Sequence, residues 1–430
     1  MSDSKVQASV VQVDITPPVG IPMEGYGARE GVSQGVHDPL VAQLLMLEGA
    51  SRRLILVAAD LLGIRLGVTR NLRTAIEQAI GPSDGVMIAC SHTHSGPAGF
   101  MPEVPGLRTY SDPDFQHFVE RKIAGAALQA SRQLVPVRLG WGSGRVRGIG
   151  TNRNDPDSDR LDDELLILRV DDSEGQPLAV LMNYGCHPTV LGQDNLLLTA
   201  DFPGAARSIL ARIFPDTVFL FTNGASGDVS TRFTRREQTF TEAERMGSIL
   251  AGGVLGTMQK VESRSSATLD CRTHALEVPF REFPPAEESQ GRIDELQHRL
   301  DAMKAEGASH GDLRRVFTQW QGAVGQSKMR ESLAGQSSIQ TELQIFHIGE
   351  GALMGLPGEP FTQSVLRIKQ DSPFLYTGVV SYCNDEIGYF PDAESFRDET
   401  YEALISPFQQ DVATLIEETS LNYLQEAHHI

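Results

Sequence analysis

The sequence predicts an α+β protein (mixed α/β), built as a layered sandwich of mixed β-sheets flanked by helices. Three observations support this prediction. Short apolar runs of strand length recur before residue 230 and again after residue 340. Some of these runs are joined by tight turns, as in antiparallel hairpins. Segments with helical spacing lie between the runs, so helices and strands are interspersed along the chain.

The elements follow in order from the N-terminus. In residues 8–15, apolar and polar side chains alternate as in a strand, and a Pro-Pro-Val-Gly turn follows. Residues 44–47 and 54–59 form a predicted hairpin of two strands. Helical spacing is found at residues 69–80, 115–134 and 207–214. Further strand-like runs are residues 85–90, 137–140, 165–170, 178–183, 218–222, 341–348 and 352–356.

Residues 283–335 differ from their surroundings. Two stretches of apolar residues at helical spacing, around Leu296 and Val316, are separated by a break at residues 307–311. We expect a helical hairpin inserted within one large domain that spans residues 1–430. The polar faces of this hairpin are rich in Glu, Arg and Gln, which favours a structural or packing role over a binding role.

Composition excludes several classes of function. Of the 430 residues, 40% are hydrophobic and 22% are charged, as in ordinary globular proteins, and the formal net charge is −19. Such an acidic chain is poorly suited to nucleic acids or anionic membranes, and no apolar run is long enough for membrane insertion. The N-terminus lacks the pattern of a secretory signal, and four scattered cysteines suit a reducing compartment, so we expect a cytoplasmic location.

The most informative motif is Ser91-His92-Thr93-His94, which follows the apolar run of residues 85–90. Residues two apart on a strand share a face, so His92 and His94 are expected to point the same way at a strand end. Imidazole is the commonest metal ligand and the usual acid or base near neutral pH. By itself the motif is compatible with a metal or catalytic site and with two polar residues at a surface turn.

Other segments place chemically useful side chains after short strands or in polar loops. His187, before a proline, is either a third imidazole of the site or a structural residue. The Gly/Asn/Ser-rich turn from Asn223 to Ser230 could present backbone N–H groups to an oxyanion. The remaining candidates are Glu359 in a rigid Pro-Gly-Glu-Pro turn, Arg153 in a polar loop, Tyr389 and Tyr401.

Two or three histidines with one carboxylate, and no cluster of cysteines, indicate a catalytic zinc site (Zn²⁺) rather than a structural one. Such a site leaves one position open for water and lowers the pKa of that water. A neighbouring Tyr or Arg can then hold the oxyanion that develops.

Taken in order, these motifs resemble the neutral/alkaline ceramidase family, zinc-dependent amidases that split the N-acyl bond of ceramide. The resemblance runs from residue 10 to about residue 410 and so covers nearly the whole chain. The matching motifs are Asp14-Ile-Thr-Pro, Gly25-Tyr26, His37-Asp38-Pro-Leu, His92-Thr-His94-Ser-Gly-Pro, Asn152-Arg153, His187, Gly227-Asp-Val-Ser230, Pro357-Gly-Glu359, Gly388-Tyr389 and Tyr401.

The resemblance implies a role for each site residue. The implied zinc ligands are His92, His187, Glu359 and Tyr389. The residues implied to contact the scissile carbonyl or the attacking water are His94, Arg153 and Tyr401. Ser230 would lie at or beside the site. We favour attack by metal-activated water over attack by Ser230, because a serine nucleophile needs an adjacent general base and the histidines have other roles.

This chain also departs from the family. Typical ceramidases are longer, carry a secretion signal and end in an immunoglobulin-like domain. Their Gly-Asp-Val-Ser motif continues Pro-Asn, whereas Thr231-Arg232 follows it here, which could help bind an anionic substrate. We therefore expect a zinc-dependent hydrolase of an amide (N-acyl) bond in a small-molecule substrate whose identity stays open.

Three alternatives remain beside this expectation. One is a metal-dependent esterase or lactonase on the same scaffold, since amide and ester hydrolysis both pass through a tetrahedral oxyanion. Another is a non-enzymatic binding protein that kept the fold. The third is an amidohydrolase barrel, in which an HxH motif also binds metal.

Overall fold

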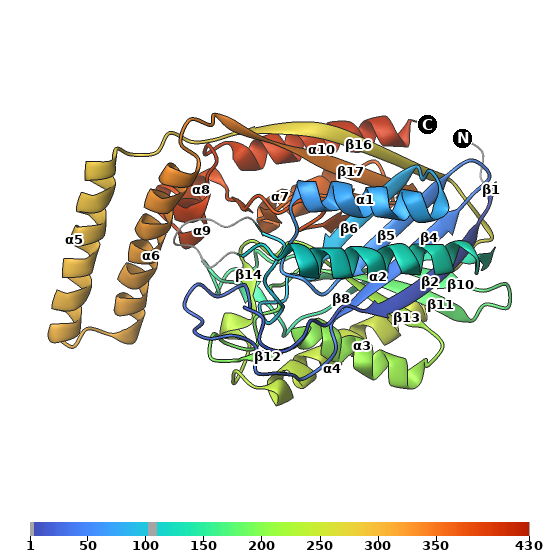
Figure 1. Cartoon of the computed structure of the whole chain (residues 1–430), viewed down its shortest axis with the longest axis horizontal. Coiled ribbons are helices and arrows are strands. Elements are labelled where there is room, and N and C mark those ends of the chain that lie inside the picture. The colour runs from blue at the N-terminus through green and yellow to red at the C-terminus, as the bar shows by residue number, and fades with distance from the viewer. Residues whose placement is uncertain (1–3, 102–109, 430) are drawn as a thin grey trace.

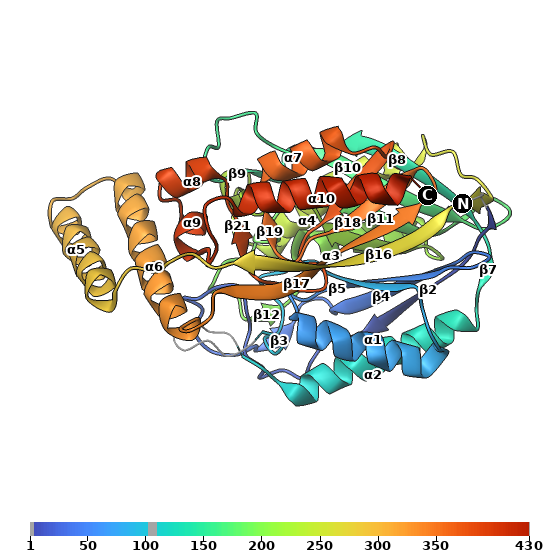
Figure 2. The same cartoon turned by 90° about the horizontal axis from the view of Figure 1, so that it is seen from above.

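Three large β-sheets form the centre of the computed structural model, which describes residues 4–101 and 110–429 (Figure 1). The first sheet has the strand order β6-β5-β4-β2-β7. Its strands are β2 (Gln7–Asp14), β4 (Val41–Glu48), β5 (Arg53–Ala59), β6 (Gly85–Cys90) and β7 (Val135–Pro136). Most neighbours are antiparallel, but β5 and β6 run parallel. Helices α1 (Leu66–Ile80) and α2 (Pro113–Ser131) cover one face of this sheet (Figure 2).

The second and third sheets are also mixed. The second has the order β13-β11-β10-β8, and helices α3 (Asp201–Ile213) and α4 (Phe240–Met258) pack on it. Its strands are β8 (Arg138–Arg145), β10 (Glu164–Asp171), β11 (Pro177–Tyr184) and β13 (Val218–Asn223). The third has the order β16-β17-β18-β20, and α7 (Thr362–Asp371) and α10 (Val412–His428) pack on it. Its strands are β16 (Leu269–Pro279), β17 (Ser338–Ile348), β18 (Gly351–Gly355) and β20 (Tyr376–Val380).

The three sheets share a central hydrophobic core. On β4, Leu45 faces this core while Leu44 faces α1 and α2, so the strand is buried on both sides. Leu168 from the second sheet and Phe346 from the third complete the same cluster. Each fully buried Leu or Phe contributes about 1.5–3 kcal/mol relative to exposure. This packing fixes the ends of strands from different sheets relative to one another.

Short strand pairs and helices gather the loops at those strand ends. The paired segments are β1 (Ser4–Lys5) with β15 (Ser266–Ala267), β3 (Gly35–Val36) with β12 (Leu197–Leu198), β9 (Thr151–Asn152) with β14 (Val229–Ser230), and β19 (Glu359–Pro360) with β21 (Tyr389–Phe390). The short helices are η1 (Thr231–Phe233), α8 (Ala393–Arg397) and α9 (Tyr401–Ile405). Most of the predicted site residues lie on or beside these short elements.

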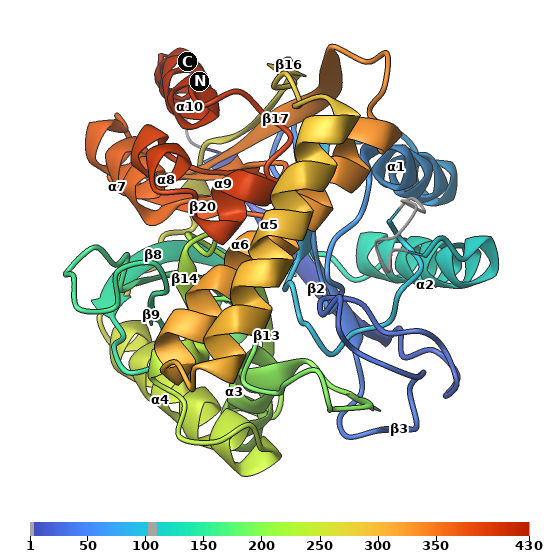
Figure 3. The ribbon, with the colours of Figure 1, turned by 90° about the vertical axis from the view of Figure 1, so that its left-hand side faces the viewer.

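Residues 283–335 contain α5 (Ala286–Ala305) and α6 (His310–Ser332), which project side by side from the body of the protein (Figures 1 and 3). They enclose a small core of their own, to which Leu296 and Val316 contribute. Helix α6 packs against α9, where a Cβ added at Gly322 would lie 2.6 Å from Leu404. Close packing at this glycine connects α6 to α9, the helix that begins with Tyr401.

The predicted fold class is confirmed, and so are the antiparallel hairpins at β4–β5 and β17–β18. The amidohydrolase barrel is excluded, because all three large sheets contain antiparallel pairs. Helix α3 begins at residue 201, earlier than the predicted 207, since Pro203 is tolerated in a first helical turn. Helices α4, α7 and α10 were not predicted. Within the described ranges, no helix combines the length and apolar character needed to cross a membrane.

Candidate active site

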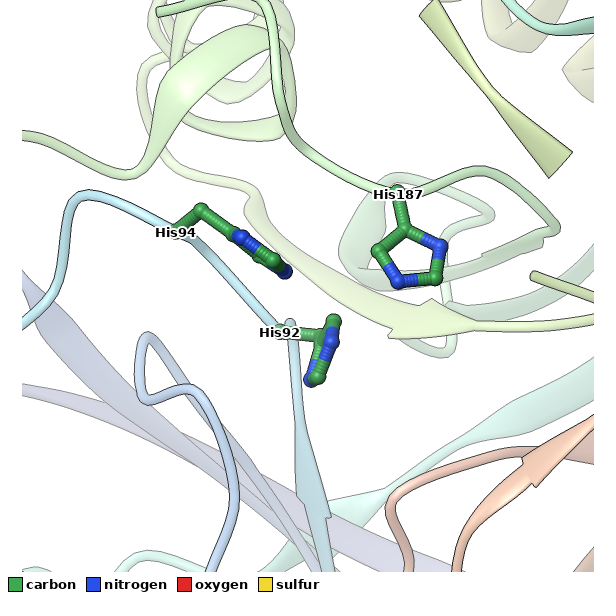
Figure 4. Close-up of side chains that lie close together, drawn as sticks. All are labelled: His92, His94 and His187. Atoms are coloured by element: carbon green, nitrogen blue, oxygen red, sulfur yellow. The ribbon is translucent and has the colours of Figure 1, made fainter. Parts of the chain in front are cut away.

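Three imidazoles converge at the ends of two strands from different sheets. His92 and His94 follow β6, and His187 follows β11 (Figure 4). Each ring offers a nitrogen atom, and these three atoms lie within 4.8 Å of one another. His92 and His187 are buried, and His94 is half-buried. The spacing suits a shared metal ion or a shared substrate.

The backbone holds His92 in an unusual conformation. Its φ is +64°, in the left-handed region that residues other than glycine rarely adopt. Two hydrogen bonds keep it there: its N–H donates to the carbonyl of Leu61 (2.9 Å), and its Nδ1 donates to the carbonyl of Leu62 (2.7 Å). Since a carbonyl only accepts, Nδ1 carries the proton and the Nε2 lone pair is left for the site.

His187 is oriented in the same manner. Its Nδ1 donates to the carbonyls of Ser226 (2.5 Å) and Val229 (3.1 Å). Its buried Nε2 has no hydrogen-bond partner among the described residues. Backbone carbonyls thus set the tautomer of both imidazoles, as is common for metal-ligating histidines.

Asn223, at the end of β13, ties the two histidine loops together. Its Nδ2 donates to the carbonyls of Ser91 (3.1 Å) and Cys186 (3.2 Å), and its Oδ1 accepts the N–H of Cys186 (3.1 Å). This side chain is fully buried. The turn that begins here is predicted to present N–H groups to an oxyanion, but the N–H groups of Gly224, Gly227 and Val229 donate to backbone carbonyls of the fold. The carbonyls of Ser226 and Val229 in this turn accept from His187.

Glu359 faces both imidazole lone pairs. Its Oε2 lies 3.1 Å from Nε2 of His187 and 3.8 Å from Nε2 of His92. Tyr389 stands beside Glu359 in the parallel β19–β21 pair, and its side chain helps to lower the pKa of the carboxyl group. A carboxylate oxygen and a nitrogen lone pair repel each other unless a proton or a metal cation lies between them. The donor set therefore fits a cation.

Burial keeps the imidazoles neutral. It lowers the pKa of His92 and of His187 to about 3, and it lowers the pKa of His94 well below its usual value. Burial raises the pKa of Glu359, and the neighbouring His92 ring and the positive charge of Arg153 oppose that rise. A neutral imidazole is the form that binds a metal ion, so these shifts favour metal binding at neutral pH.

His94 is held from the N-terminal segment. Tyr26 packs edge-to-face against its ring with centroids 5.0 Å apart, and Arg29 donates to its carbonyl oxygen (2.7 Å). A Cβ at Gly25 would lie 2.6 Å from Cγ of His94, so only glycine fits there. Neither ring nitrogen of His94 has a hydrogen-bond partner in the described parts of the chain. Both remain available to a metal ion, a substrate or a water molecule.

Arg153 and the two predicted tyrosines lie beside Glu359. The Nε of Arg153 is 2.6 Å from Oε1 of Glu402, and its Nη2 donates to the carbonyl of Gly227 (2.7 Å). Its guanidinium carbon is 5.4 Å from the centre of the Tyr389 ring, and the neighbouring Tyr389 helps to raise the pKa of Arg153. Tyr401 opens α9 and lies within the electrostatic reach of Arg153.

Ser230 is buried beside the site. It forms a β-bridge with His187, and its Oγ accepts the N–H of Arg232 (3.4 Å), which caps η1. Among residues 4–101 and 110–429, no imidazole is hydrogen-bonded to this hydroxyl. The structure therefore brings Ser230 to the site without the adjacent base that a serine nucleophile needs.

Sequence reasoning missed two site residues. Tyr382 stacks on His92 with ring centroids 3.7 Å apart, and its hydroxyl bridges Ser226 Oγ (2.8 Å) and Glu359 Oε2 (3.2 Å). Glu402 balances the charge of Arg153. Tyr382 follows a short apolar strand, β20, as the predicted site residues follow theirs, so that signal was present in the sequence.

Comparison with known proteins gives a consistent result. The family model for the N-terminal part of neutral/alkaline non-lysosomal ceramidases matches residues 7–241. The chain is 28% identical over 215 residues to the neutral ceramidase of Pseudomonas aeruginosa, covering 45% of this chain and 32% of that one. It is 26% identical over 226 residues to neutral ceramidase A of Dictyostelium discoideum, covering 47% and 31%. These matches span about a third of the length of each curated relative.

The fold is similar over almost the entire chain. The crystal structure of the Pseudomonas aeruginosa neutral ceramidase superposes with a TM-score of 0.76 at 19% identity, covering 98% of this chain and 74% of that one. A ceramidase complexed with C2 superposes with a TM-score of 0.78 at 18% identity, covering 99% and 76%. The likeness of fold extends beyond residue 241, where the family model ends.

Proposed function

Because the chain belongs to the neutral/alkaline non-lysosomal ceramidase family, we propose that it is a zinc-dependent hydrolase that cleaves an amide bond. The observation that carries the proposal is the approach of the Glu359 carboxylate to the Nε2 lone pairs of His92 and His187. Three neutral imidazoles and a carboxylate, with no thiolate, are the donors of a catalytic zinc site.

His92, His187, Glu359 and Tyr389 would hold the ion. When bound, zinc would polarise a carbonyl and lower the pKa of a water molecule. The geometry also allows His94 as a ligand, since its ring nitrogens share the cluster. We assign His94 to the substrate instead. Hydrogen bonds to backbone carbonyls fix the tautomer of His92 and of His187, and the ring of His94 makes no such bond in the described parts of the chain.

The remaining side chains suit the substrate carbonyl. Arg153, kept charged by Glu402, supplies a fixed positive group for an oxyanion. Burial raises the pKa of the Tyr401 hydroxyl, so this group keeps its proton and donates to the same oxygen. His94 is neutral, so it can accept a proton from the attacking water and deliver it to the nitrogen of the leaving amine.

The test uses protein purified without chelator and matched N-octanoyl and O-octanoyl derivatives of ethanolamine. We expect hydrolysis of the amide that stops when zinc is removed and returns when zinc is added. His92→Ala should lose zinc, whereas His94→Ala should keep zinc and lose turnover. Turnover of esters or lactones with amides untouched would refute the amidase and indicate an esterase or lactonase.

A further inference from the structure

The imidazole cluster is formed by residues outside the helical insert at residues 283–335. The two helices of the insert form one packed unit, because Leu296 of α5 and Val316 of α6 belong to a buried core that the helices share. This unit meets the body of the protein at α9, the helix Tyr401–Ile405, which lies beside α6 (Figure 2). The insert therefore adjoins the site through a short helix.

One side of α9 is part of the site. The Oε1 of Glu402 lies 2.6 Å from Nε of Arg153, and the Glu402 side chain is buried. Directly after α9, the hydroxyl of Ser406 donates to the carbonyl of Tyr389, a proposed zinc ligand (2.9 Å). The position of α9 therefore sets where Tyr401 and the Arg153–Glu402 pair stand relative to the proposed zinc ligands.

This helix is too short to hold its own position. Isolated helices of fewer than about 12–15 residues are marginal in water, and α9 has five residues. The chain also approaches α9 through Glu399, whose φ of +49° lies in the left-handed region. A conformation of that kind persists where the surrounding structure enforces it. Contacts from outside α9 must therefore fix its position.

Two glycines of α6 supply the first of these contacts. A Cβ added at Gly322 would lie 2.6 Å from both Cβ and Cδ1 of Leu404, and one added at Gly325 would lie 3.1 Å from Cγ2 of Ile405. Gly322 and Gly325 are three positions apart on α6, so they face α9 together. The absence of a Cβ at both positions lets the backbone of α6 approach α9 closely.

Arg281, in the segment that leads into the insert, supplies the second contact. Its Nη1 donates to the carbonyl of Ala403 within α9 (3.0 Å), and its N–H donates to the carbonyl of Pro407 just beyond α9 (2.9 Å). Its guanidinium carbon lies 5.6 Å from the centre of the Phe396 ring in α8. Helix α9 thus has the insert on one side and Arg153 on the other.

We propose that the helical insert positions the groups that contact the substrate carbonyl. Helix α6 and Arg281 hold α9 in place, and α9 in turn holds Tyr401 and the Arg153–Glu402 pair beside the proposed zinc ligands. Gly322 and Arg281 are positioning residues of the reaction, because they act through α9. The proposal rests on the amide hydrolase function proposed above and gives the insert a part in that function.

Gly322→Ala tests this role by moving α9. Ordinary contact begins at 3.4 Å, so a Cβ at 2.6 Å must move α6 and α9 apart by about 0.8 Å. Rotation of the Leu404 side chain does not relieve the overlap, because its Cβ is fixed by the backbone. A displacement of about 1 Å can lower an enzymatic rate about 100-fold, and we expect kcat to fall by at least about tenfold. KM should change little, because Tyr401 and Arg153 act on the oxyanion rather than on the bound amide.

Gly291→Ala is the matched control. Gly291 lies in α5, where an added Cβ meets no atom within 4 Å. Both substitutions place alanine in a helix of the insert and so raise helix propensity equally. With N-octanoylethanolamine and zinc-loaded protein, kcat should fall in Gly322→Ala and stay unchanged in Gly291→Ala, while both variants keep the zinc content of the wild type. If Gly322→Ala does not fold, Gly325→Ala applies the same test with the milder overlap of 3.1 Å.

Hydrogen–deuterium exchange followed by mass spectrometry reports on α9 without turnover. Gly322→Ala should accelerate exchange at residues 401–405 and also at residues 151–155, because the anchor of Arg153 on Glu402 moves with α9. Gly291→Ala should leave exchange in both segments unchanged. An insert with a purely structural role would alter exchange in α6 and α9 alone.

Each outcome decides one claim. An unchanged kcat in Gly322→Ala, an equal fall in Gly291→Ala, or unchanged exchange at residues 151–155 overturns the positioning role and leaves the hydrolase standing. If the wild type cleaves no amide, the proposed function fails, and hydrogen exchange alone decides the role of the insert. Faster exchange at residues 151–155 then supports the positioning role, and unchanged exchange overturns it.

Discussion

Replacing Asn223 with alanine removes the side chain that joins the two histidine loops. Three hydrogen bonds are lost, two to carbonyls and one from the N–H of Cys186, all in a fully buried environment. Each such bond contributes about 1 kcal/mol net, and each stranded buried group costs about 1–3 kcal/mol. We expect the free energy of unfolding to fall by about 3–5 kcal/mol.

The same substitution should weaken metal binding, because the loops that carry His92 and His187 lose their common anchor. Outer residues that orient metal ligands typically change affinity by about 10–100-fold. Zinc affinity is measured by competition with a chromophoric chelator, and stability by urea unfolding of metal-free protein.

Asn183→Ala is the matched control. Asn183 is buried on β11, and its Nδ2 donates to the Val379 carbonyl (2.8 Å) and the Thr222 hydroxyl (3.1 Å), away from the histidine loops. Its loss should lower stability to a similar degree while zinc affinity is retained. Equal zinc affinity in the two variants would refute the anchoring role of Asn223.

Three further predictions concern the surroundings of the site. Burial raises the pKa of Glu24 to about 8, so this carboxyl stays protonated in the fold. As the pH rises from 4.5 to 8, the stability of the wild type should therefore fall by up to about 5 kcal/mol relative to Glu24→Gln, as measured by urea unfolding. Gly25→Ala should lower turnover by at least about tenfold, because the φ of residue 25 is +102° and the added Cβ would collide with the ring of His94. Gly27→Ala is the control and should leave turnover unchanged, since its added Cβ would point into open space. Tyr382→Phe should keep zinc but lower turnover by about tenfold, since the hydrogen bond to Glu359 is lost while the ring remains; unchanged kinetics would contradict this reasoning.

The sequence predicted the location of the site better than its internal geometry. Apolar runs followed by polar turns identified the strand ends, and the structure brings His92, His187, Glu359 and Tyr389 from four such ends to one place. The expectation that His92 and His94 share a face rested on the period of a strand. The strand ends at residue 90, and a left-handed turn at His92 brings the rings to 4.9 Å instead.

The supporting contacts could not be derived from local pattern. Tyr382 stacks on His92 because β20 of the third sheet packs near β6 of the first, and its φ of +53° lies in the left-handed region. Glu402 meets Arg153 across 249 positions of sequence, through α9. Such contacts depend on how the three sheets meet, which strand and helix periodicity does not specify.

The most direct test of the central claim is the rate of amide hydrolysis as zinc is added back to metal-free protein. The proposed function predicts that the rate rises in proportion to zinc and saturates at one equivalent per chain, with no rise in His187→Ala. Hydrolysis that is equally fast without zinc, or a zinc response that survives in His187→Ala, would contradict it.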